Sequence, residues 1–177
     1  MPVSPSPIWD VFCRVIDNLG DIGVCWRLCA QLGARGHRVR LWIDQTAPLA
    51  WMAPGGAPGV TVHPWTEPFD PAGQTPGDVW IEAFGCDLPD AFVAARTLDP
   101  VWINLEYLSA EAYVERMHGL PSPVMSGPGR GLVKTFFFPG FTAGTGGLLR
   151  EDGLLAQREA FDRHAWLARH GLPPEGH

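Results

Sequence analysis

Two aspartates and two glycines lie in residues 17–23, Asp-Asn-Leu-Gly-Asp-Ile-Gly. The apolar run 8–16 precedes this segment and predicts a strand, whereas residues 24–35 predict a helix. In open α/β sheets, ligands bind in the crevice at the carboxyl ends of the strands, where such a segment lies. Because Asp17 and Asp21 would repel a phosphate group, the segment predicts a site for a cation.

Both carboxylates are expected to be ionised, because the amides and the dipole at a helix start favour an anion. Two anions in one crevice favour a shared cation, which is a metal, a lysine or a guanidinium. No clear third or fourth oxygen or histidine ligand lies nearby in the sequence, which weakens the case for a metal. A planar guanidinium matches carboxylates through its fork of donors. The alternative interpretation is that Asp17 or Asp21 only caps the helix.

Three further residues of this segment are candidates for binding substrate. Gly20 and Gly23 are interpreted as positions of positive φ, as places where a ligand approaches bare backbone, or as both. Asn18 is interpreted first as a turn residue, with orientation of Asp17 or of the substrate as the alternative. No GxGxxG follows the first predicted strand, so a dinucleotide fingerprint is absent.

Alternating strands and helices predict a Rossmann-like, doubly wound, mainly parallel α/β sheet. The predicted strands are short and almost continuously apolar, as strands buried on both faces are. Glu106 and Tyr107 follow one of these strands, at the end of the sheet where binding sites usually lie, and are candidates for binding substrate. Glu82 lies at the end of the strand predicted over 79–83 and is a weaker candidate. The predicted strands are residues 9–16, 38–43, 60–63, 79–83, 101–105 and 132–138; the predicted helices are 24–35, 89–98, 109–117 and 153–170; the predicted loops are 53–59, 67–77 and 119–131.

Composition favours one globular domain and argues against several classes of partner. The chain has 177 residues, 46% of them apolar, and a net charge of −6. Lys134 is the only lysine among 13 basic residues, and no basic cluster indicates nucleic acid. Residues 1–7 do not read as a signal peptide and no apolar run is long enough to span a membrane, so we expect a cytoplasmic protein. Cys25 and Cys29 share an apolar helix face and are expected to be buried, reduced thiols.

Five blocks of sequence, in the same order, resemble the bacterial elongation factor P arginine rhamnosyltransferases, the EarP family. Together they span nearly the whole chain, which makes the resemblance far more specific than one motif. The blocks are DNLGDIGVCWRL at 17–28, WINLEYLS at 102–109, HGLPSP at 118–123, FFFPGFT at 136–142 and TGGLLRE at 145–151.

The resemblance implies the N-terminal domain of a GT-B glycosyltransferase, an enzyme in which two Rossmann-like domains face each other across a cleft. The family transfers L-rhamnose from dTDP-β-L-rhamnose to the guanidine of an arginine of translation elongation factor P, with inversion at the anomeric carbon. No metal or other cofactor is expected, and we expect a monomer. Residues 1–152 are expected to bind the acceptor, and residues 153–177 to form a helix and linker toward a C-terminal nucleotide-sugar-binding domain that this sequence lacks. The chain alone is therefore expected to be inactive.

Within the resemblance, Asp21 matches the general base and Asp17 matches a second required aspartate. The pKa of an aspartate is about 3.9 and that of arginine at least about 12.5, so Asp21 cannot remove the proton in advance. It is expected to orient the nitrogen and to accept its proton as the C–N bond forms, while Asp17 holds the other N–H groups. Two alternatives remain open: a non-catalytic module that binds elongation factor P, and a GT-B glycosyltransferase domain with another acceptor.

Overall fold

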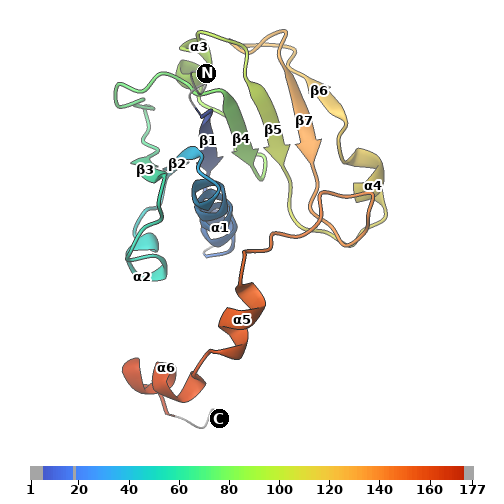
Figure 1. The fold of residues 1–177 in the computed structure, drawn as a ribbon. Coiled ribbons are helices and arrows are strands. Elements are labelled where there is room, and N and C mark those ends of the chain that lie inside the picture. Colours follow the sequence, from blue (N-terminus) through green and yellow to red (C-terminus); the bar gives the residue numbers. More distant parts are fainter. Residues whose placement is uncertain (1–5, 18, 174–177) are drawn as a thin grey trace, which may run out of the picture.

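One sheet of seven strands organises the part of the chain that the computed structural model describes, residues 6–17 and 19–173. The strand order is β3-β2-β1-β4-β5-β7-β6, and every neighbouring pair is parallel except β6 and β7 (Figure 1). This Rossmann-like α/β arrangement confirms the predicted fold class. The strands are β1 (Ile8–Cys13), β2 (Arg38–Ile43), β3 (Val60–Pro64), β4 (Val79–Ala83), β5 (Val101–Leu105), β6 (Pro121–Pro123) and β7 (Val133–Phe137). The helices are α1 (Gly20–Ala34), α2 (Leu49–Met52), α3 (Asp90–Ala94), α4 (Tyr113–Met117), α5 (Leu154–Glu159) and α6 (Arg163–Arg169).

The sheet is covered on both faces. Successive strand residues point to opposite sides, so each strand contributes side chains to two separate layers of the core. On one face, aliphatic residues of β1, β2 and β4 pack against α1, whose Cys25 and Cys29 are fully buried. Both thiols are free, which confirms the prediction of buried, reduced cysteines. On the other face, aromatic residues such as Phe12, Trp42 and Trp80 pack against Phe92 of α3.

Several predicted boundaries were wrong. The strand predicted over 9–16 ends at Cys13, the helices predicted over 89–98 and 109–117 are shortened to α3 and α4, and α2 was not predicted. Helix α1 begins at Gly20 rather than at residue 24, so the two glycines of the 17–23 segment are helical. The single helix predicted over 153–170 is two helices, because Asp162 accepts a hydrogen bond from the Ala165 amide at 2.9 Å and starts α6 anew. The loop predicted over 119–131 contains β6, which pairs with β7 although two of its residues are proline.

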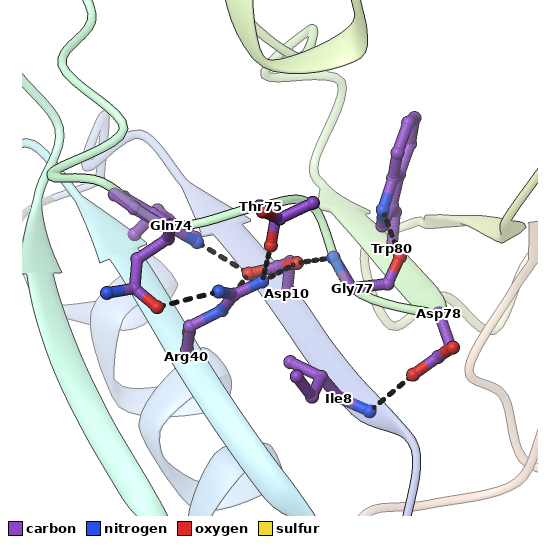
Figure 2. Close-up of polar contacts among 9 residues, drawn as sticks. Ile8, Asp10, Arg40, Gln74, Thr75, Gly77, Asp78 and Trp80 are labelled. Carbon is purple, nitrogen blue, oxygen red and sulfur yellow. Dashed lines mark hydrogen bonds and ion pairs between the residues drawn. The ribbon is translucent and has the colours of Figure 1, made fainter. Parts of the chain in front are cut away.

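A buried ion pair fixes β1 to β2 at their amino-terminal half. Asp10 and Arg40 are direct partners in the register of the two strands, and Arg40 donates to both carboxylate oxygens at 2.7 and 2.6 Å. Trp42 Nε1 and the Gly77 amide complete the shell of Asp10 at 2.8 and 2.7 Å. Arg40 also donates to Gln74 and to the Thr75 carbonyl, so one pair holds the loop that enters β4 (Figure 2).

The two carboxyl-terminal helices extend away from the sheet, and nearly all of their residues are exposed (Figure 1). Arg27 of α1 pairs with Glu151 and also donates to the Leu149 carbonyl at 3.3 Å, so the segment leading into α5 is fixed to the domain. None of the helices described here is long and apolar enough to cross a membrane.

Candidate functional site

The candidate site lies where the strand order reverses. From β1 the chain moves outward through β2 and β3, then returns to the other side of β1 and continues through β4 and β5 (Figure 1). The loops after β1, β4 and β5 therefore meet at the carboxyl end of the sheet, which is the usual ligand position in such folds. These loops supply Asp17, Phe84 and Tyr107, and the start of α1 supplies Asp21.

Asp21 is 1% exposed, yet none of the ion pairs among the described residues includes it. Its Oδ2 accepts hydrogen bonds from the amides of Ile16 and Asp17, both at 2.9 Å. Its Oδ1 accepts the Tyr107 hydroxyl at 3.1 Å. The residue at the N-cap of α1 is Leu19, and no side chain caps the helix. Asp21 thus ties down the loop before the helix, and the interpretation of it as a simple helix cap was wrong.

Asp17 is exposed and stands beside the first turn of α1. A Cβ atom added to Gly20 would lie only 3.0 Å from Asp17 Oδ2, so Gly20 leaves the space that this carboxylate occupies. None of the ion pairs among the described residues involves Asp17 or Asp21. These two carboxylates therefore have no ion-pair partner in the part of the chain that the structure describes.

The two glycines differ from the interpretation made from the sequence. Both Gly20 and Gly23 are helical, and neither has a positive φ, so the interpretation as positions of positive φ was wrong. The alternative, that a ligand approaches bare backbone there, stays a prediction. The close approach at Gly20 is to Asp17, while a Cβ at Gly23 would meet Met52 of α2 at an ordinary 3.5 Å. Gly23 thus faces α2. Asn18 lies outside the described residues.

Tyr107 is stacked on Phe84, with ring centroids 4.3 Å apart and an interplanar angle of 12°. Partial burial, and then the bond to Asp21, raise the pKa of Tyr107 to about 12. The phenol therefore keeps its proton near neutral pH and donates to Asp21. Phe84 has a left-handed backbone, with a φ of 58°, and its amide donates to the Leu105 carbonyl at 2.7 Å. Sequence reasoning missed Phe84, although an aromatic residue directly after a strand and before Gly85 was the available signal.

The structure separates the neighbours Glu106 and Tyr107. Tyr107 joins Asp21, whereas Glu106 Oε1 accepts from Asn104 Nδ2 at 3.0 Å. Glu82, the weaker candidate, is 2% exposed and accepts from Lys134 at 2.7 and 3.0 Å. Burial raises the pKa of Glu82, and Lys134 opposes that rise. Glu82 therefore has an internal counter-ion, unlike Asp17 and Asp21.

A separate cavity of about 540 Å³ opens beside Trp65 and the loop after β4. Arg14 lies over the Trp65 ring at 4.5 Å and pairs with Glu67 on the cavity wall. Burial raises the pKa of the Cys86 thiol to about 12, so this lining residue is not a thiolate near neutral pH. Neither Asp17, Asp21 nor Tyr107 lines this cavity. Among the described residues, no group of three or more His, Cys, Asp or Glu is arranged to hold a metal.

Comparisons with known proteins agree on one family. A family model described as elongation factor P rhamnosyltransferase EarP matches residues 9–176. The chain is 51% identical over 173 residues to a protein-arginine rhamnosyltransferase of Pseudomonas putida, covering 91% of this chain and 44% of the relative. Relatives with the same name from Pseudomonas aeruginosa and Neisseria meningitidis are 47% and 39% identical over 86% and 98% of this chain. The chain spans about half the length of these relatives, 42% and 46% of the latter two.

Proposed function

The chain belongs to the elongation factor P rhamnosyltransferase family, and we propose that it is the acceptor-binding half of a protein-arginine rhamnosyltransferase. The whole enzyme transfers L-rhamnose from dTDP-β-L-rhamnose to an arginine of elongation factor P, in the cytoplasm. In this proposal the domain is the N-terminal half of a GT-B glycosyltransferase. The region beyond it binds the nucleotide sugar, and neither a metal nor another cofactor takes part.

One observation carries the proposal, namely that the buried carboxylate of Asp21 is held by neutral donors and has no ion-pair partner among the residues that the structure describes. Three neutral donors fix its orientation, and Oδ1 still has a lone pair after accepting the Tyr107 hydroxyl. Asp17 supplies a second, exposed carboxylate beside the first turn of α1. A guanidinium offers charge together with several N–H donors, so it satisfies both carboxylates better than a neutral sugar hydroxyl does.

The proposed reaction forms a bond between a terminal guanidine nitrogen and the anomeric carbon of rhamnose. The bond from that carbon to the diphosphate oxygen breaks, and the nucleotide leaves with the electron pair. The nitrogen loses one proton to Asp21 during bond formation, since the large pKa gap forbids earlier removal. The product guanidinium keeps its positive charge, so Asp17 can hold it throughout. Position and electrostatics, rather than a strong base, then supply most of the rate.

The test is a calorimetric titration of this chain with unmodified elongation factor P. We expect binding that weakens at least about tenfold when Asp17 and Asp21 are both changed to alanine, since each loses a charge-assisted bond. The same loss is expected when the acceptor arginine is changed to lysine. Asp99→Ala is the matched control, because it removes an exposed carboxylate that pairs only with Arg96, just before β5. Equal binding by all variants would contradict the proposed site.

A further inference from the structure

We propose that Tyr107, backed by Phe84, is a flat platform on which the planar guanidine group of the acceptor arginine stacks. The inference rests on the proposed function and assigns Phe84 as a positioning residue. It also makes the choice of arginine over lysine a property of the aromatic pair as well as of the carboxylates.

The geometry leaves one ring face for a ligand. Phe84 packs against the aliphatic core of β1, β2 and α1, and Tyr107 lies on top of it at 4.3 Å. Tyr107 is nevertheless 49% exposed, and Phe84 is the only ring that contacts it among the described residues, so we infer that the face turned away from Phe84 meets solvent. The hydroxyl on that same ring contacts Asp21 Oδ1 at 3.1 Å, which puts the exposed face next to the fixed carboxylate.

The ring is also electronically suited to a cation. Its hydroxyl donates to a carboxylate, which polarises the phenol toward its anion and makes the π face more negative. Arginine stacks on aromatic faces through its flat, weakly hydrated guanidinium, whereas the compact lysine ammonium is strongly hydrated and has no plane to align. A guanidinium lying flat on Tyr107 can keep its N–H groups directed sideways, toward the carboxylates of Asp17 and Asp21.

Stacking also determines where the sugar can approach. The electron pair that a guanidine nitrogen uses to form a new bond lies perpendicular to the guanidine plane. With one face covered by Tyr107, only the outer face stays open to the anomeric carbon. The platform therefore gives the nucleophile one direction of attack, which is the positional control that such a transfer requires.

Phe84 supports Tyr107 from an unfavourable backbone conformation. Its φ of 58° is unusual for a residue with a bulky side chain. The strain is maintained by the bond from its amide to the Leu105 carbonyl, which ties the β4 loop to the end of β5. The result is a ring that supports Tyr107 from below.

The experiment measures the ratio of two affinities for each variant of the chain. Elongation factor P carrying its acceptor arginine, or lysine at that position, is titrated into the wild type and into Tyr107→Phe, Tyr107→Leu, Phe84→Leu and Phe84→Tyr. Tyr107→Leu is expected to lower the preference for arginine by about three- to thirtyfold. Phe84→Leu should lower it in the same direction by less, while Phe84→Tyr and Tyr107→Phe, which keep a ring, should retain most of it.

The ratio of the affinities for the arginine and lysine acceptors distinguishes a stacking role of Tyr107 and Phe84 from a merely structural one. A folding defect lowers the affinity for both acceptors together, whereas loss of the platform lowers the affinity for arginine selectively. Circular dichroism and thermal melting of each variant verify that it is folded. A folded Tyr107→Leu variant with the wild-type ratio would overturn the platform and leave the carboxylate site intact. A wild-type chain that does not prefer arginine would overturn the proposed function and the platform with it.

Discussion

Asp10 and Asp21 are two buried aspartates on either side of the first loop, and they are satisfied in opposite ways. Asp10 is 0% exposed and has an internal cation, since Arg40 donates to both of its oxygens. Asp21 is 1% exposed, and its three partners are two backbone amides and a phenol, all neutral. The first arrangement lies inside the sheet, whereas the second lies at the carboxyl end of the sheet.

This difference separates a structural charge from one that can bind a ligand. A buried carboxylate is expensive unless it is paired, and Asp10 meets that condition within the fold. Asp21 is fixed by neutral donors that hold the anion without neutralising it. Its remaining attraction for a cation is therefore available to an external group. Replacement by asparagine should therefore lower mainly the stability at Asp10 and mainly the affinity for the acceptor at Asp21.

The largest expected effect is that of Asp10→Asn on stability. An amide in this place turns an NH₂ group toward Arg40 in either orientation, and also toward Trp42 Nε1 or the Gly77 amide. It leaves a buried guanidinium without its anion. We expect a loss of about 3–5 kcal/mol in the free energy of unfolding, measured by urea denaturation followed by tryptophan fluorescence. Asp78→Asn is the matched control in the same region, where an exposed carboxylate accepts only the Ile8 amide (Figure 2). A loss below about 1 kcal/mol at Asp10 would mean that the ion pair is not structural.

Asp21→Asn should instead leave stability nearly unchanged and weaken binding. The amide oxygen can keep the bonds from Ile16 and Asp17, and the Tyr107 hydroxyl can rotate to accept from the new NH₂ group. We expect a change in the free energy of unfolding below about 1 kcal/mol, with an affinity for elongation factor P about ten- to hundredfold lower. Urea denaturation and calorimetry on the same preparation measure the two quantities. If the free energy of unfolding falls and the affinity does not, Asp21 is a structural residue like Asp10 and not a binding residue.

Gly20→Ala gives a smaller effect and tests the position of Asp17. The new methyl group would crowd Asp17 Oδ2 at 3.0 Å and displace the carboxylate. Alanine is the better helix former by about 0.5–1 kcal/mol, so the variant should be as stable as the wild type or slightly more stable. Its affinity for the acceptor is expected to fall about threefold to tenfold, through a weakened charge-assisted bond. Gly23→Ala controls for the helix effect, since its methyl group meets only Met52; an equal loss there would refute the role of Asp17.

The sheet was largely predictable from the sequence, because its central strands are buried on both faces. The strands at 38–43, 79–83 and 101–105 were predicted with their observed bounds, since most residues in each of them are apolar. Strand β6 was not, because two prolines in a glycine-rich stretch indicate a loop unless a neighbouring strand supplies the pairing. The break before α6 had a local signal, the capping residue Asp162, which the apolar residues around it obscured.

The site was predictable in part. A carboxylate pair after the first strand is a local pattern, and neither carboxylate forms an ion pair among the described residues. The cation site itself stays a prediction. The contact between Asp21 and Tyr107 joins residues distant in the sequence, so only the topology reveals it. Phe84 was missed because its local signal, an aromatic residue between a strand and Gly85, does not reveal the contact with the distant Tyr107. The Asp10–Arg40 pair was overlooked for a different reason: opposite charges in two apolar strands indicate pairing only once their register is known.

Lys134 is the only lysine side chain in the sequence, and it lies between the Glu82 carboxylate and the Trp102 ring. Its side chain is only 18% exposed. Acylating reagents attack a neutral, accessible amine, so labelling of Lys134 requires its release from Glu82. The rate of acylation at this one side chain therefore reports local opening between β4 and β7. The protein carries its own chemical probe of native-state fluctuation, and no reporter group has to be introduced.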